Sequence, residues 1–103
     1  MILSTSDQAD DRPIRRGNLL HANAISGANI IRDMREAVTN TIGGHMTRYE
    51  SLLDKTIDRA LQELTRRAEA QGYDGLVGVR IVHPTITTGA IAVVVFGTGF
   101  NFA

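Results

Sequence analysis

Three histidines are the side chains of this chain best suited to bind a transition metal. They are His21, His45 and His83, and no two of them lie within four residues of each other. A chelate formed by neighbouring residues, such as a helical His-x-x-x-His pair, is therefore excluded. We select His45 and His83 as candidate ligands of a divalent transition metal, with Asp33 or Glu50 as oxygen donors, at a contact between copies of the chain. The alternative is three unrelated histidines at the surface or in hydrogen bonds.

Polar residues beside two glycine turns form a second group of candidates, for ligand binding or for contacts between subunits. They are Asn29, Arg32, Asp33, Tyr49 and Glu50. A carboxylate beside such a turn could orient a ligand or accept a proton, with its pKa tuned by burial. The structural alternative places Arg32 and Asp33 in a subunit contact and gives Glu50 the task of capping a helix.

The chain carries no recognisable pattern of an enzyme. It has no cysteine, which excludes disulfides, thiolate metal sites and cysteine nucleophiles. Gly43-Gly44 precedes a predicted helix, as in some anion-binding loops, but neither Gly-x-x-x-x-Gly-Lys nor Gly-x-Gly-x-x-Gly is present. No serine lies in a Gly-x-Ser-x-Gly pattern. We therefore expect no catalytic site and no evident cofactor, a divalent transition metal being the one candidate.

The composition is that of a small globular protein without a dominant charge. The 103 residues allow one domain, and 43% of them are hydrophobic. Eleven acidic and eleven basic residues cancel, so neither nucleic acid nor a membrane surface is an expected partner. The longest apolar run, Ala90 to Phe96, is far shorter than the ~20 residues of a membrane-spanning helix. The N-terminus shows no signal-peptide pattern, and we expect a cytoplasmic protein.

The chain divides into a polar N-terminal segment, residues 1–17, and a single domain, residues 18–103. Met1 to Thr5 could add a short edge strand, and the rest of the segment is expected to be a loop. Alternating or continuous apolar residues predict three further strands, at Leu19–Ile25, Leu76–His83 and Ala90–Phe96.

Two helices are predicted between the first and second of these strands. Asn29 is a plausible N-cap of a short helix that ends at Gly43-Gly44. Thr47 to Glu50 fits a capping box at the start of a long amphipathic helix, which is expected to end at Gly72. The apolar stripe of the long helix contains Leu53, Ile57, Ala60, Leu61, Leu64 and Ala68.

The opposite face of the long helix is charged. Arg59, Glu63 and Arg67 follow one another at a spacing of four residues, which allows two weak ion pairs. We interpret this face as exposed to solvent.

The hairpin formed by the last two strands is apolar on both faces. Ile91, Val93 and Val95 alternate with Ala92, Val94 and Phe96, and the preceding strand places Val77, Val79 and Ile81 opposite Leu76 and Val82. A lone antiparallel hairpin normally keeps one polar face. One long helix covers one face only, so the second face predicts self-association. The alternative is that the N-terminal segment covers it.

Motifs in order along most of the chain resemble the YbjQ-like family, which carries a heavy-metal-binding label. The matching residues are Ser4-Thr5, Gly27-Ala28-Asn29-Ile30, Arg32-Asp33, Gly43-Gly44, Tyr49-Glu50, Ala60, Glu63-Leu64, Ala68, Gly72-Tyr73-Asp74-Gly75-Leu76-Val77-Gly78-Val79 and Gly97-Thr98-Gly99. The ordered set is specific, although no single motif is.

The resemblance implies a YbjQ-like, dodecin-subunit-like α+β fold, with a small antiparallel β-sheet packed on one long amphipathic helix plus a short helix. It also implies assembly into a pentameric ring or a stacked pair of rings. Relatives often have an acidic run where this chain has Arg80 to Pro84, and arginine and serine where it has His45-Met46. The expected function is that of a homo-oligomeric binding or scaffolding protein, a pentamer or decamer that partners itself. The alternative is metal-ion or small-ligand binding at subunit contacts.

Overall fold

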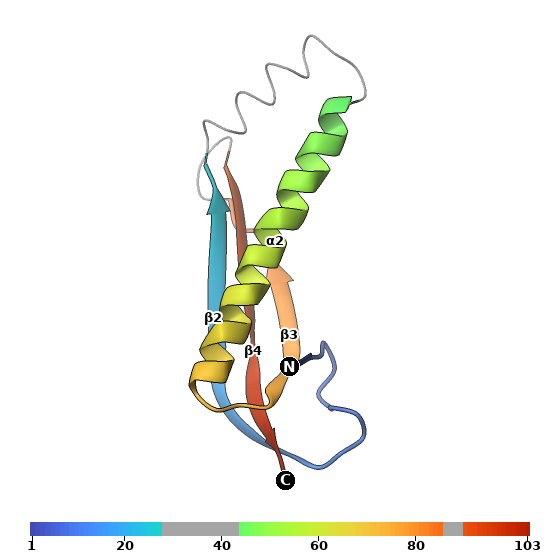
Figure 1. The fold of residues 1–103 in the computed structure, drawn as a ribbon, viewed down its shortest axis with the longest axis vertical. Helices are drawn as coiled ribbons and strands as arrows, with labels where there is room; N and C mark the ends of the chain where they lie inside the picture. Colours follow the sequence, from blue (N-terminus) through green and yellow to red (C-terminus); the bar gives the residue numbers. More distant parts are fainter. Residues whose placement is uncertain (28–43, 86–89) are drawn as a thin grey trace.

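The chain forms one helix and four strands in the part that the computed structural model describes, residues 1–27, 44–85 and 90–103, with side chains described from Glu50 onward in the helix. In chain order the elements are β1 (Ile2–Leu3), β2 (Ile14–Ser26), α2 (Gly44–Ala70), β3 (Gly75–Val82) and β4 (Ile91–Phe102). The strands form one sheet in the order β1-β3-β4-β2, and α2 lies across it (Figure 1). This arrangement confirms the predicted α+β class. The predicted short helix after Asn29 lies outside the described residues.

The sheet is mixed, whereas an antiparallel sheet was expected. β4 pairs antiparallel with both β2 and β3, but β1 runs parallel to β3, with Ile2 opposite Gly75 and Leu3 opposite Leu76. The predicted edge strand at the N-terminus is therefore present. Residues 4–13 then carry the chain to the opposite edge of the sheet, where β2 begins.

β2 and β4 are longer than predicted, and glycines within them make room for Tyr73. A Cβ atom on Gly17 or Gly99 would overlap the Tyr73 ring. The backbone N–H of Asn18 also donates a hydrogen bond to the Tyr73 hydroxyl, at 2.8 Å. β2 therefore runs through the predicted boundary at residue 17, and β4 continues to Phe102.

A bulge at Gly78 changes which side chains of β3 face the helix. Gly78 has a φ of +62°, and the register with β4 shifts between the pairs Val77–Thr98 and Arg80–Phe96. Val79 consequently joins Leu76 beneath α2, while Val77 lies in a separate cluster. The expectation that Val77 and Val79 share a face is therefore wrong.

The long helix begins three residues before the predicted capping box. α2 starts at Gly44 and has no acidic residue in its first turn, so Thr47 to Glu50 lies inside the helix and is not its cap. The predicted end is confirmed. Gly72 has a φ of +79°, its N–H donates to the Glu69 carbonyl, and the Tyr73 N–H donates to the Ala68 carbonyl, which together make a Schellman motif.

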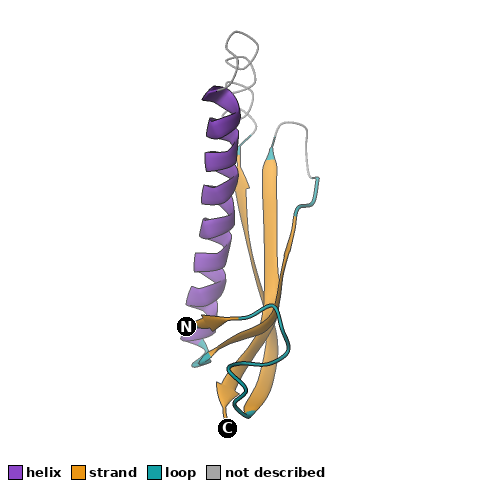
Figure 2. Cartoon of the chain, turned by 90° about the vertical axis from the view of Figure 1, so that its right-hand side faces the viewer, coloured by secondary structure: helices purple, strands orange, loops and turns teal. Residues whose placement is uncertain are grey.

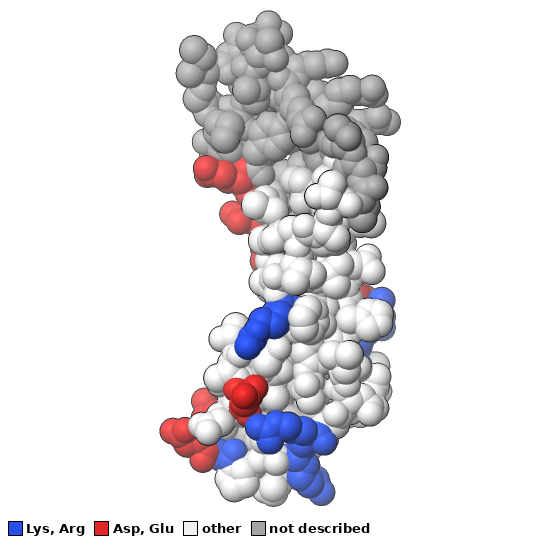
Figure 3. Space-filling view, turned by 180° about the vertical axis from the view of Figure 1, so that it is seen from behind, with Lys and Arg blue, Asp and Glu red and all other residues white. Residues whose placement is uncertain are grey.

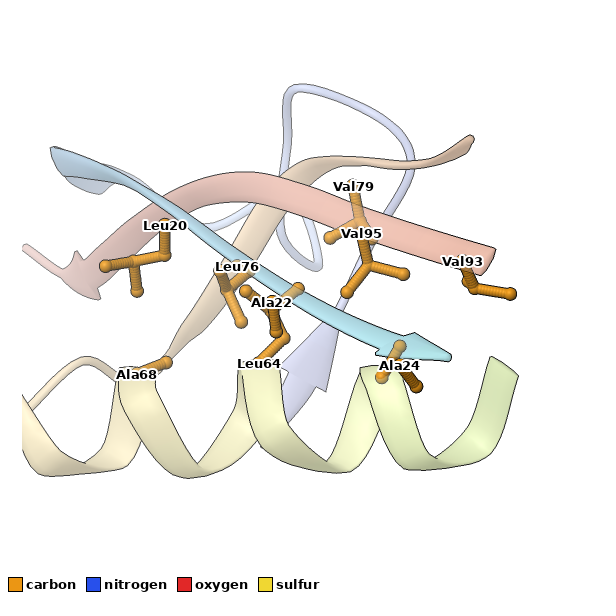
Figure 4. Close-up of a cluster of buried hydrophobic side chains, with 10 residues drawn as sticks. Leu20, Ala22, Ala24, Leu64, Ala68, Leu76, Val79, Val93 and Val95 are labelled. Carbon is orange, nitrogen blue, oxygen red and sulfur yellow. The ribbon is translucent and has the colours of Figure 1, made fainter. Parts of the chain in front are cut away.

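The main core lies between α2 and one face of the sheet (Figure 4). Ala60, Leu64 and Ala68, from the predicted stripe, are fully buried. They pack against side chains of all three long strands, which are Leu20, Ala22, Ala24, Leu76, Val79, Val93 and Val95. Ile57 and Leu61 are partly buried at the border of this core, and Leu53 is exposed. Alanines on both the helix and β2 allow the two elements to approach closely.

The N-terminal segment covers part of the other face. Ala9 is 1% exposed and packs with Val77 and Phe100, and Phe102 lies at the border of this second cluster. The Arg12 guanidinium lies 3.7 Å from the centre of the Phe102 ring, a cation–π contact. Figure 2 shows the connecting loop on the side of the sheet opposite to α2. The alternative that the N-terminal segment covers the second face of the sheet is thus correct for one end of that face.

Candidate ligand pocket and open sheet face

A mainly apolar pocket lies between α2 and the ends of β3 and β4 that are joined by residues 83–90. Its volume is about 430 Å³, which is within the usual range for small-molecule sites. The lining residues are Glu50, Leu53, His83, Pro84, Thr85, Ala90, Ile91 and Ala92. The pocket therefore combines an apolar floor with a few polar groups at its border.

Local sequence explains why this pocket forms. β3 ends at Val82, and Pro84 lacks the N–H that would continue the ladder. The chain therefore leaves the sheet beside the first half of α2, where Leu53 is still exposed. Glu50 lies within the helix, not at its cap, and it lines the pocket.

Glu50 and His83 give the pocket its chemistry. Both side chains are exposed, and together they offer a carboxylate and an imidazole above an apolar surface. Such a set suits a small apolar ligand that carries a cationic or hydrogen-bond-donating group. Two donors fall short of the three or four protein ligands usual for zinc. Within residues 1–27, 50–85 and 90–103, no three His, Asp or Glu side chains cluster closely enough to hold a metal ion.

The structure brings together one pair of the residues selected from the sequence, Glu50 and His83. His45 and Tyr49 belong to α2, but their side chains lie outside the described part. Asn29, Arg32 and Asp33 also lie outside the described residues. The other pocket residues were missed. The turn at Pro84 was their only signal, and it could not show which part of the helix lies beside it.

The second feature is the part of the outer sheet face beyond the N-terminal segment. The register places Ile25, Val82, Val94 and Phe96 on this face, and we call them the open strip. Ile25 is 49% exposed and Val82 43%, while Val94 and Phe96 are half-buried. Figure 3, which views this face, shows uncharged surface over much of the sheet, interrupted by a basic side chain near its middle, with further charged groups toward the lower end. The open strip is thus an apolar surface with a polar border.

Several side chains on the charged face of α2 form hydrogen bonds with each other or with β2. Glu63 accepts hydrogen bonds from Arg66, at 2.8 and 2.5 Å, and from Arg67, at 3.0 Å. The hydrogen bonds from Arg66, then those from Arg67, lower the pKa of Glu63 to about 2. Of the two predicted ion pairs, Glu63 with Arg67 is present. Arg59 instead donates to the Ile25 carbonyl of β2, at 3.1 Å.

No helix in the described part of the chain has both the length and the apolar character needed to cross a membrane.

Comparison with known proteins adds the family. A solved crystal structure of a protein of unknown function from Pediococcus pentosaceus, assigned to the DUF74 family, matches with a TM-score of 0.70. The match covers 100% of this chain and 98% of that one at 15% identity, and it therefore supports the fold alone.

Similar sequences include a UPF0145 protein of Synechococcus sp. (strain JA-3-3Ab), 33% identical over 99 residues, which are 95% of each chain. A UPF0145 protein of Bacillus anthracis is 32% identical over 99 residues, covering 95% of this chain and 96% of its own. The model of the YbjQ family, described as "Putative heavy-metal-binding", matches residues 1–103. The resemblance found in the sequence is confirmed, and the chain belongs to the YbjQ family.

Proposed function

We propose that this protein is a homo-oligomeric binding or scaffolding protein without a catalytic site, built from copies that meet through the open strip. One observation carries the proposal: Ile25 and Val82 remain 49% and 43% exposed beside Val94 and Phe96 on a continuous sheet face. Contiguous apolar surface bordered by polar groups is typical of protein–protein contacts. Polar groups at the border include His21, opposite Phe96 in β4, and Arg80 in β3.

The size of the assembly in this proposal comes from the family resemblance. A pentameric ring, or a stacked pair of rings, would bury the open strip of every copy. Binding would then take place in a central pore, in grooves between subunits or on the faces of the ring.

Charged substitutions in the open strip test the proposal. Ile25→Glu combined with Val82→Glu places carboxylates on side chains that are already exposed, so the protomer should still fold. We expect the assembly to dissociate to monomers in size-exclusion chromatography with light scattering. Gln62→Glu adds a carboxylate to an exposed position of α2 and should leave the assembly intact. A double variant that keeps the wild-type mass would rule out the open strip as the contact.

A second candidate function is binding of a metal ion or small ligand in the pocket, completed at a contact between subunits. The observation that favours it is the presence of Glu50 and His83 in one pocket. A second copy could supply the missing donors, since two are too few for a transition metal.

Calorimetric titration with zinc, copper and nickel measures this second function. We expect His83→Ala and Glu50→Gln each to weaken binding at least about tenfold if both are ligands. Glu69→Gln removes an exposed carboxylate of α2 that does not line the pocket and serves as the matched control for Glu50→Gln. Binding that is unchanged in a His45→Ala, His83→Ala double variant would remove both histidines as ligands.

A further inference from the structure

β2 forms one edge of the sheet over its full length. It is the last strand in the order β1-β3-β4-β2 and spans thirteen residues, Ile14–Ser26. The outer side of an edge strand presents N–H and C=O groups that can pair with a strand from another molecule. The opposite edge, β1, has only two residues. β2 is therefore the long edge of the sheet, at which a strand from another molecule could pair unless something blocks it.

Two arginines from α2 bind carbonyl groups on this edge. Arg67 donates from Nη1 to the His21 carbonyl at 2.7 Å, and Arg59 donates from Nη2 to the Ile25 carbonyl at 3.1 Å. These carbonyls are acceptors that an added strand would need, because alternate residues of an edge strand direct their backbone groups outward. Asn23 lies between His21 and Ile25 at the same parity, so its backbone groups also point outward.

The spacing of the two contacts follows from the geometry of the two elements. His21 and Ile25 are four residues apart in a strand, a rise of about 13 Å. Arg59 and Arg67 are eight residues apart in a helix, a rise of about 12 Å. The two pairs match in opposite order along the chain, as expected if α2 runs antiparallel to β2. The two arginines, about two helical turns apart, therefore contact the two ends of the same stretch of β2, residues 21–25.

Glu63 positions one of these arginines. Its Oε1 accepts from Arg67 Nε at 3.0 Å, while Arg67 Nη1 reaches the His21 carbonyl. Arg67 is therefore fixed by hydrogen bonds at both sides of its guanidinium group, which lowers the entropy cost of its contact with the strand. Arg66 also donates hydrogen bonds to Glu63, at 2.8 and 2.5 Å.

We propose that Arg59 and Arg67 close the β2 edge against addition of the β2 strand of a second copy. The same strand is the natural occupant, because every copy presents an equally long edge. The inference concerns the edge of the sheet and not the open strip on its face, so it stands or fails separately from the proposed function. Copies of the protein are thereby directed away from continuous sheet formation.

The double variant Arg59→Gln, Arg67→Gln tests this proposal. Both side chains lie at the surface, so loss of their charge should leave the protomer folded, as circular dichroism would show. In light scattering at increasing protein concentration, we expect an average mass that rises to about twice the wild-type value or more. Arg59→Lys combined with Arg67→Lys keeps donors at both positions and should preserve the wild-type mass.

Two controls make the result specific to the edge. Arg66→Gln combined with Lys55→Gln removes the same charge from exposed positions of α2 and should behave as wild type. Asn23→Pro removes an outward N–H from the edge without breaking the ladder to β4. Added to the double variant, it should restore the wild-type mass.

Either of two results would overturn the proposal. One is a double glutamine variant whose mass equals that of wild type at every concentration. The other is growth that persists after Asn23→Pro, because such growth would not use the edge. If the double variant failed to fold, the single variants would decide, with growth expected in each and its absence in both counting against the proposal.

Discussion

At the scale of single residues, close contacts explain why a particular residue type is required at a given position. Gly99 is the clearest case, because the Tyr73 ring occupies the space that a side chain there would need. We expect Gly99→Ala to lower the free energy of unfolding by about 1–3 kcal/mol, since an inserted methyl group must displace the ring. Urea denaturation measures this change. Gly27→Ala is the matched control and should be close to neutral, because no atom beyond its two chain neighbours lies within 4 Å of its Cβ position.

Glu63 gives a prediction for pH at the same scale. Its pKa is lowered from 4.5 to about 2 by hydrogen bonds from Arg66 and Arg67, so folding favours its charged form. The resulting stabilisation is present above pH 4.5 and is lost as the pH falls toward 2. We expect the difference in melting temperature between wild type and Glu63→Gln to be present near neutral pH and to shrink over this interval. A difference that stays constant down to pH 2 would contradict the assignment.

At the scale of elements, a buried pair of hydroxyl groups joins the end of β2 to α2. Thr56 Oγ1 donates a hydrogen bond to the Leu52 carbonyl at 2.7 Å. Because its proton is used there, Thr56 Oγ1 accepts the second hydrogen bond from Ser26 Oγ, at 2.6 Å. Both residues are buried. Thr56→Val leaves the Ser26 hydroxyl without this acceptor and should cost about 1–3 kcal/mol of unfolding free energy.

The double variant Ser26→Ala, Thr56→Val checks this prediction. It removes both hydroxyl groups and should recover part of the loss seen in Thr56→Val, as measured by thermal or urea denaturation. If the losses of unfolding free energy in Ser26→Ala and Thr56→Val simply added up in the double variant, the two hydroxyl groups would not act as a pair.

The elements themselves were predictable where local patterns specify them. The stripe of α2 follows from apolar spacing, and its end follows from Gly72, whose positive φ suits a C-terminal cap. The beginning of α2 was misjudged because Thr47 to Glu50 matches a cap without being one. The bulge at Gly78 was also not foreseeable, since a glycine within a strand does not reveal its φ.

Long-range contacts explain what sequence reasoning missed. Ala9 lies in a polar run, yet it is buried against Val77 and Phe100, residues far away in the chain. In the candidate site, Glu50 and His83 could be selected singly, but their shared pocket depends on where β3 ends relative to α2. The contacts of Arg59 and Arg67 required knowledge that β2 is an edge strand.

At the scale of the whole molecule, the two faces of the sheet are covered to different extents. α2 covers one face, and the N-terminal segment covers one end of the other. The open strip is an apolar part of that second face that stays accessible in the described part of the chain, and we propose that it forms the contacts between copies. The arginines along β2 complement this role, because they leave the face accessible while closing the edge.

Native mass spectrometry of the unmodified protein is the most direct test of self-association. We expect a dominant species at five or ten times the protomer mass of 11.2 kDa. This species should persist on dilution to about micromolar concentration, as an obligate apolar interface should. A stable monomer under these conditions would show that the copies do not associate through the open strip.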